Sequence, residues 1–332
     1  MFKDRLPLYQ ELGAKRNTKV IVYVTGDRRQ LETQVSPEVV DLFTCHLDPV
    51  AKDKRISLYL YTRGGDTLAA WNIANLIRQF ADYLEVIVPS KAHSAGTLMC
   101  LGANNVIMTK QATLGPIDPS VLTALNPQIL GAPADARFPV SVEDVNGFME
   151  FSKDALAGRE GLDRVLASLC DKVHPLVLGK AFRARTQIRM LAKKLLSNQI
   201  QNLEQVERIL QFLCSESGSH DYTINRREAK DELGLPIEKP NDDLYSLIKR
   251  IYDDIANELQ LTVPYDPRIL VGAANEADYC FRRALIESVA GGTHVFISEG
   301  KLSKRQVQTQ PNVVETRVHD QRLFEGWRTE NA

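Results

Sequence analysis

Between residues 19 and 109 the sequence alternates β-branched runs with apolar stripes at helical spacing. Strand-like runs at residues 19–25, 55–61 and 84–89 are separated by stretches with apolar side chains at steps of three and four, most clearly at residues 66–83. A further strand-like run follows at 105–109. Strands that alternate with helices over short connections predict a wound α/β core with mostly parallel pairing.

Beyond about residue 141 the pattern changes to that of helices. Residues 142–156, 162–172, 179–198 and 204–215 each place apolar side chains along one helical face. A polar stretch rich in Pro, Asn and Asp at 236–243 predicts a domain edge.

The remainder of the chain is expected to hold two more helices and a strand. The helices are predicted around residues 242–259 and 275–288, and the strand at 294–298. The last ~25 residues are polar, which predicts a tail or an edge element.

Composition narrows the class of protein. The chain has 332 residues, 44% of them hydrophobic and 25% charged, with a net charge of -1. These values are typical of a globular protein and give no reason to expect nucleic acid as a ligand. The first residues are charged where a signal peptide is apolar, and no run reaches the ~18–20 apolar residues of a membrane span. We therefore expect a cytoplasmic protein without a membrane span.

Cysteine and histidine usage argues against a metal or disulfide framework. The five cysteines are scattered and lack CxxC spacing, which favours reduced core residues. The histidines show no cluster at ligand spacing. We expect neither a bound metal nor a cofactor.

Two segments at strand-to-helix turns carry the chemistry. Gly64-Gly65 ends one strand, and Ser94, followed by Ala95-Gly96, stands after the next. Acyl transfer by serine needs a nucleophile at a sharp turn and donors for the oxyanion, and the N–H groups of Gly65 and Ala95 suit the second task. Taken singly, the glycine pair is also typical of a turn, and Ser94 of a helix N-cap.

The two segments together resemble the Clp protease and crotonase superfamily, and within it the serine dehydrogenase proteinase family, which is related to signal-peptide-peptidase-like serine proteases. The similarity rests on the sequence around Gly64-Gly65 and on His93-Ser94-Ala95-Gly96-Thr97, in that order and spacing. Ala112 to Pro119 resembles the corresponding later segment of the family, and the likeness runs from about residue 14 to residue 300.

The resemblance implies an α/β fold, a Clp/crotonase-like spiral of β-β-α units with an additional helical segment. Residues 1–18 would then be an N-terminal extension and residues 241–332 an appendage of helices and strands. Residues 19–240 would form the catalytic domain, with a helical insertion at about 141–215. The resemblance further implies a nucleophilic Ser94 and an oxyanion hole at Gly64, Gly65 and Ala95.

The general base is not fixed by the resemblance. Clp proteases carry histidine where this chain has Asp118, and signal-peptide peptidases use a lysine that is missing from the matching segment. We hypothesise that His220 is the base and that Asp118 orients it, because a triad is defined by geometry and not by chain order. His174, at a predicted helix start, and Lys153, inside a predicted helix, remain alternatives.

The sequence thus predicts a serine peptidase that acts on peptide or protein substrates through an acyl-enzyme. A crotonase-like acyl-CoA enzyme is the alternative within the superfamily, and a non-catalytic scaffold on the same fold is the alternative outside enzymes. The resemblance also implies a homo-oligomer, with the helices between residues 141 and 215 as candidate contacts. Labelling of Ser94 by a fluorophosphonate probe would distinguish the peptidase from the acyl-CoA enzyme and the scaffold.

Overall fold

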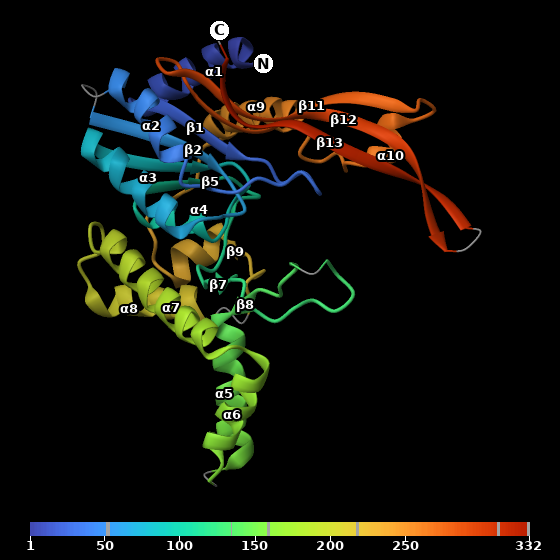
Figure 1. Ribbon diagram of the computed structural model, residues 1–332. Coiled ribbons are helices and arrows are strands. Elements are labelled where there is room, and N and C mark those ends of the chain that lie inside the picture. Colours follow the sequence, from blue (N-terminus) through green and yellow to red (C-terminus); the bar gives the residue numbers. More distant parts are fainter. Residues whose placement is uncertain (51–53, 134, 158–159, 217–218, 311–312, 331–332) are drawn as a thin grey trace. The chain divides into compact units, whose positions relative to one another are not determined.

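The computed structural model describes residues 1–50, 54–133, 135–157, 160–216, 219–310 and 313–330. The chain divides into two compact units, one made of residues 1–114 with 225–332 and the other of residues 115–224. Figure 1 shows the chain coloured along the sequence. Each unit is described by itself.

The first unit is built on an eight-stranded sheet, counted over the described residues, in the order β10-β5-β3-β2-β1-β11-β12-β13. The strands that pair in parallel are β1 (Lys19–Thr25), β2 (Lys54–Tyr61), β3 (Ala81–Val88), β5 (Asn105–Met108) and β10 (Ile237–Glu238). In β1 every residue after Lys19 is buried, as expected for a strand covered on both faces. The predicted wound core with parallel pairing is confirmed.

Short strands that follow the long ones give the fold its repeating unit. β3 is followed by β4 (Lys91–Ala92) and α4 (Ala95–Leu101), and β5 is followed by β6 (Thr113–Leu114). β4 and β6 pair in parallel, so successive strand pairs contribute to two ladders. This arrangement agrees with the predicted spiral of β-β-α units, and the α/β fold class is confirmed.

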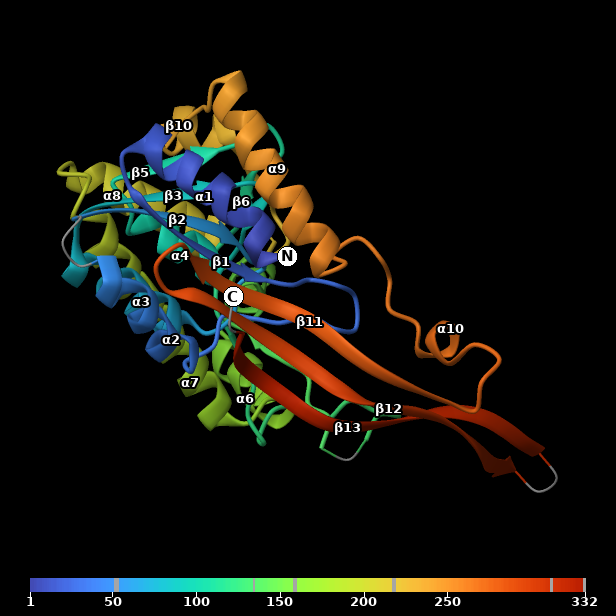
Figure 2. The ribbon, with the colours of Figure 1, turned by 90° about the horizontal axis from the view of Figure 1, so that it is seen from above.

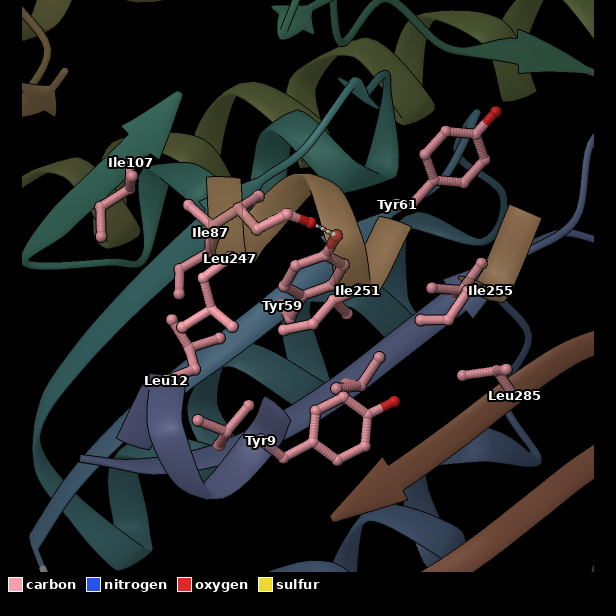
Figure 3. Close-up of a cluster of buried hydrophobic side chains, with 14 of the residues drawn as sticks. Tyr9, Leu12, Tyr59, Tyr61, Ile87, Ile107, Leu247, Ile251, Ile255 and Leu285 are labelled. Atoms are coloured by element: carbon pink, nitrogen blue, oxygen red, sulfur yellow. Dashed lines mark hydrogen bonds between the residues drawn. The ribbon is translucent and has the colours of Figure 1, made fainter. Parts of the chain in front are cut away.

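Helices cover both faces of the main sheet (Figure 2). α1 (Phe2–Arg16) and α9 (Asp242–Glu258) pack their apolar side chains on one face, where Tyr9 and Ile251 join Tyr59 of β2 in one cluster (Figure 3). α2 (Val39–Leu47) reaches the sheet through an edge-to-face contact between Phe43 and Tyr23. α3 (Thr67–Phe80) begins at Asp66, whose side chain accepts from the Ala69 N–H.

One predicted helix is a strand. Residues 275–288 were expected to be helical, but β11 (Glu276–Ser288) pairs antiparallel with β1 over Ile21 to Thr25. The segment is rich in residues that favour either state, and the open edge of β1 decides, since tertiary context overrides local propensity.

Two long strands complete the sheet. β12 (Gly292–Gln310) contains the predicted strand at 294–298 and continues beyond it, and β13 (Val313–Glu330) pairs with it as the edge strand. The two extend past the rest of the sheet as a ribbon (Figures 1 and 2). α10 (Pro267–Val271) lies between α9 and β11 in the chain. The expected polar edge element is therefore present.

A buried ionic cluster ties α1 to the sheet and to α9. Arg5 is 0% exposed and donates to Glu287 of β11 from Nε at 3.0 Å and from Nη2 at 2.5 Å. It also donates to Glu258 at 2.6 Å and to Asp254, and the Tyr9 hydroxyl donates to Glu287. Buried charges persist only when paired and hydrogen-bonded, so α1 is part of this unit's interior.

The second unit is mainly helical. Its helices are α5 (Val142–Leu156), α6 (Leu162–Lys172), α7 (Pro175–Leu196) and α8 (Leu203–Gln211), the last continued by a π-helical turn at Phe212–Glu216. The predicted helices at 142–156 and 162–172 have these bounds, and the other two are confirmed with shifted ends. Short strands β7 (Ser120–Val121) and β8 (Val140–Ser141) pair antiparallel. A small core of Val121, Val140, Val142, Val177 and Ala181 joins these strands to α5 and α7.

The chain returns to the first unit through β9 (Ile224–Asn225). A π-helical turn at Glu228–Glu232 follows, and β10 comes next.

Candidate active site

Ser94 occupies a strained turn in the first unit. It links β4 to α4 with φ 51° and ψ −112°, a conformation that costs a residue with a Cβ about 1–3 kcal/mol. Hydrogen bonds on either side hold it there: Gly96 N–H donates to His93 O at 2.8 Å, and Leu98 N–H donates to Ser94 O at 3.1 Å. The backbone therefore fixes the position of the Ser94 Cβ atom.

The glycine pair is equally constrained. Gly64 and Gly65 have φ of 116° and 143°, which L side chains rarely adopt. Val35 N–H donates to Gly64 O at 2.9 Å, and Asp66 N–H donates to Val35 O at 2.8 Å. The backbone of Val35 is therefore hydrogen-bonded to the residues on both sides of Gly65. A Cβ on Gly65 would lie 2.5 Å from Val35 N, so only glycine fits.

The two segments meet in space. A Cβ on Gly64 would lie 2.8 Å from the Ser94 Cβ and 3.3 Å from Ala95 N, so this glycine packs directly against the serine turn. Gly64 N–H itself donates to Thr62 Oγ1 at 3.0 Å. Within the part of the chain that the structure describes, the N–H groups of Gly65 and Ala95 make no hydrogen bond. Gly64 thus contributes space, while Gly65 and Ala95 offer donors.

The neighbouring His93 has a different contact. Its Nε2 lies 2.8 Å from Thr113 Oγ1 of β6. This contact ties the serine turn to the second parallel ladder.

The second unit brings Asp118 and His220 together. His220 Nδ1 lies 2.8 Å from Asp118 Oδ1, although the two residues are 102 positions apart. Asp118 is 7% exposed, and the His220 side chain is 56% exposed. Ile117 N–H donates to Leu213 O at 2.9 Å and fixes the backbone beside the carboxylate. A buried carboxylate thus holds a solvent-facing imidazole.

The two alternative bases lie on helices of the same unit. Lys153 is exposed on α5. His174 is the N-cap of α7, where its Nδ1 accepts from Leu176 N–H at 3.1 Å. His174 therefore performs the helix-start role that the sequence allowed.

Ser288, His46 and His294 form a buried hydrogen-bonded chain that the sequence did not predict. His46 Nδ1 lies 2.8 Å from Ser288 Oγ, and His46 Nε2 lies 2.9 Å from His294 Nδ1. His46 is 0% exposed, so no substrate reaches it. Burial, together with the His294 ring, lowers the pKa of His46 to about 3. No local motif marks this chain, because its members come from α2, β11 and β12.

The expectation that the cysteines are core residues holds for Cys100 and Cys214 and is wrong for Cys45 and Cys280, which are exposed. Burial raises the pKa of the Cys214 thiol to about 12 and that of Cys100 further, so neither is a thiolate at neutral pH. The described residues hold no group of three or more His, Cys, Asp or Glu side chains placed to bind a metal ion. No described helix is long and apolar enough to span a membrane.

Comparison with protein families gives a match to the first part of the chain. Residues 1–155 match the model of a family described as ClpP-like SDH-type serine proteinase. The predicted family is confirmed over these residues. Gly64, Gly65, Ser94 and Asp118 lie within the matched part, and His220 lies outside it.

Relatives from Methanocaldococcus jannaschii cover much of the chain. The uncharacterized protein MJ0137 is 28% identical over 256 residues, which are 74% of this chain and 77% of that protein. The uncharacterized protein MJ1495 is 30% identical over 125 residues, 35% of this chain and 42% of that protein.

Solved structures of two proteases are similar at low identity. A mutant of the 1510-N membrane-bound stomatin-specific protease has a TM-score of 0.40 and 16% identity, and covers 73% of this chain and 86% of its own. A mutant ClpP1 from Listeria monocytogenes has a TM-score of 0.36 and 15% identity, with 70% and 99% covered.

Proposed function

We propose that this protein is a serine peptidase that hydrolyses peptide bonds through an acyl-enzyme on Ser94. The observation that carries the proposal is the strained Ser94 turn packed against Gly64, with N–H groups at Gly65 and Ala95 that have no partner among the described residues. The family match over residues 1–155 supports the same chemistry.

The first step would be attack of Ser94 Oγ on the scissile carbonyl carbon. As the C–O bond forms, negative charge develops on the carbonyl oxygen, and the Gly65 and Ala95 N–H groups are the donors suited to it. Because their backbone is already fixed by the Val35 pairing and by the serine turn, little reorganisation is needed. Donors of this kind each contribute about a hundredfold to a thousandfold in rate.

His220 would be the general base. Its Nδ1–H would donate to Asp118, and its Nε2 would accept the Ser94 proton. The imidazolium then returns that proton to the leaving amine, and the acyl-enzyme forms. Water attacks the ester in the second half, with His220 taking its proton and Ser94 Oγ leaving as the alcohol.

A fluorophosphonate probe tests the proposal. The wild-type protein should label, and Ser94→Ala should not. A protein that never labels would favour the acyl-CoA enzyme or the scaffold, because neither needs an activated serine. His220→Ala and Lys153→Ala compared side by side test the base, and normal labelling of His220→Ala would reject it.

We also propose that the chain forms a homo-oligomer through the second unit. The surfaces of α5 and α7 carry large exposed apolar side chains, of which Phe151 is 69% and Phe182 70% exposed. α6 buries no residue although its apolar side chains lie on one face. Exposed apolar patches on this scale are typical of protein interfaces. Light scattering on wild type and Phe182→Glu tests this, and a monomeric wild type would reject it.

A further inference from the structure

The second unit contains a cavity of about 910 Å³, and the Asp118–His220 pair forms part of its wall. All of the described side chains that line it are polar or charged, and Gly147 adds backbone alone. Binding pockets are usually lined by apolar and aromatic side chains. The composition of this wall therefore calls for an explanation.

Helix periodicity explains how the wall stays polar. Glu143, Asn146 and Glu150 of α5 follow one another at steps of three and four, so they share a face of the helix. Val142, by contrast, packs into the small valine core. The same helix thus supports the unit with one face and lines the cavity with another.

The arginines of the wall already have partners. Arg185 lies 3.3 Å from Glu143 as an ion pair and donates to Ser215 Oγ at 2.8 Å. Arg189 donates to Glu207 at 2.5 Å. Burial raises the pKa of Glu143, and the nearby Asp118 and Glu150 carboxylates act in the same direction, while Arg185 opposes it. The arginines of the wall are thus paired, whereas Glu143 Oε1 is buried and has no hydrogen-bond partner among the described residues.

Such a wall discriminates between side chains. A leucine or phenylalanine side chain in the cavity would displace water from the charged groups without forming hydrogen bonds to them, and it would contact no apolar side chain. A glutamine, serine or lysine side chain replaces the lost water with hydrogen bonds. Sites built from polar groups reject groups that leave them unpaired.

We infer that this cavity receives a hydrophilic side chain of the substrate polypeptide next to the scissile bond, so that the peptidase selects polar over aliphatic and aromatic residues at that position. The inference rests on the proposed function, in which His220 of the cavity wall is the general base for Ser94.

The test is cleavage of a degenerate peptide library, with the products sequenced by mass spectrometry. Wild type should enrich Gln, Asn, Ser and Lys over Leu, Ile and Phe by about tenfold at one position beside the cut. Asn146→Leu and Glu150→Leu should reduce this ratio several-fold. Lys153→Leu makes the same kind of change on α5 outside the cavity, and should leave it intact.

Retention of the same library on immobilised Ser94→Ala separates the two proposals. If the wild type does not label with fluorophosphonate but Ser94→Ala retains polar peptides selectively, the peptidase proposal falls, and what stands is the preference of the cavity for polar side chains. An aliphatic or aromatic preference, a ratio unchanged in both leucine variants, or no selective retention would each overturn the inference.

Discussion

The region of the proposed nucleophile in the first unit and the region of the proposed base in the second unit are built in opposite ways. Ser94, Gly64 and Gly65 are placed by backbone conformation, with positive φ at all three. Asp118 and His220 are joined by one side-chain hydrogen bond, and His220 is more than half exposed. Backbone geometry is costly to alter, whereas a side-chain pair is easily exchanged.

This difference separates stability from chemistry in the two regions. In the first, most substitutions would disturb folding as well as activity, because the donors belong to the strained backbone itself. In the second, the base can be removed with little effect on folding.

The largest effect is expected for His220→Ala. Removing the proton acceptor should lower kcat by about ten-thousandfold, as for other triad members. The melting temperature should stay close to that of wild type, because the side chain is largely exposed. Steady-state kinetics and calorimetry measure the two. Lys153→Ala is the matched control, and a loss of kcat in that variant alone would reverse the assignment.

A smaller loss of activity, combined with a loss of stability, is expected for Gly65→Ala. The new Cβ meets Val35 N and requires φ of 143° in a residue with a side chain. The displaced donor should lower kcat about a hundredfold to a thousandfold, and denaturant unfolding should show a cost of about 1–3 kcal/mol. Gly179→Ala, where a Cβ meets nothing within 4 Å, is the control. Equal stability of both variants would contradict the constraint at Gly65.

The pH dependence of stability should come from the first unit. The pKa of His46 is lowered to about 3 in the folded chain, against about 6.5 when unfolded. Below pH 6.5 His46 binds a proton in the unfolded chain but stays neutral in the folded chain. The free energy of unfolding should therefore fall by about 1.4 kcal/mol for each pH unit down to pH 3.

Unfolding in urea at pH 7.5 and at pH 4.5 measures this slope. His46→Gln should flatten it, and His319→Gln, which changes an exposed histidine, should not. A slope that survives in His46→Gln would place the acid sensitivity elsewhere.

The smallest effect concerns the strain at Ser94. Glycine tolerates φ of 51° and ψ −112°, so Ser94→Gly should be more stable than Ser94→Ala by about 1 kcal/mol, although both are inactive. Thermal unfolding of the two variants compares them directly. Equal melting temperatures would show that the turn stores little strain.

Local patterns were sufficient to predict the parallel core and the serine turn. The turn at Gly64-Gly65 is predicted by the strand-like run directly before it. The turn at Ser94 is predicted by the small residues Ala95-Gly96 directly after it. The helices at 142–156 and 162–172 were predictable for the same reason, because each shows its apolar face within one segment.

Features that depend on distant partners could not be read in this way. The segment at 276–288 became a strand because β1 had an open edge. α1 gives little sequence signal, with Pro7 inside it and polar residues on most sides. His46, Ser288 and His294 meet across more than 240 positions. The His220–Asp118 pairing was a hypothesis drawn from the family resemblance, and no periodicity points to it.

The Arg5 cluster has a practical consequence for anyone who trims this protein for expression or crystallisation. A chain started at the first strand, near residue 19, would keep every residue assigned here to chemistry. It would nevertheless leave Glu287 in the interior without its counter-charge. An orphaned carboxylate of this kind costs about 3–5 kcal/mol, a large fraction of the stability of a typical domain. Such a product would be insoluble or inactive for reasons unrelated to catalysis, so the purification tag belongs before α1 and never in its place.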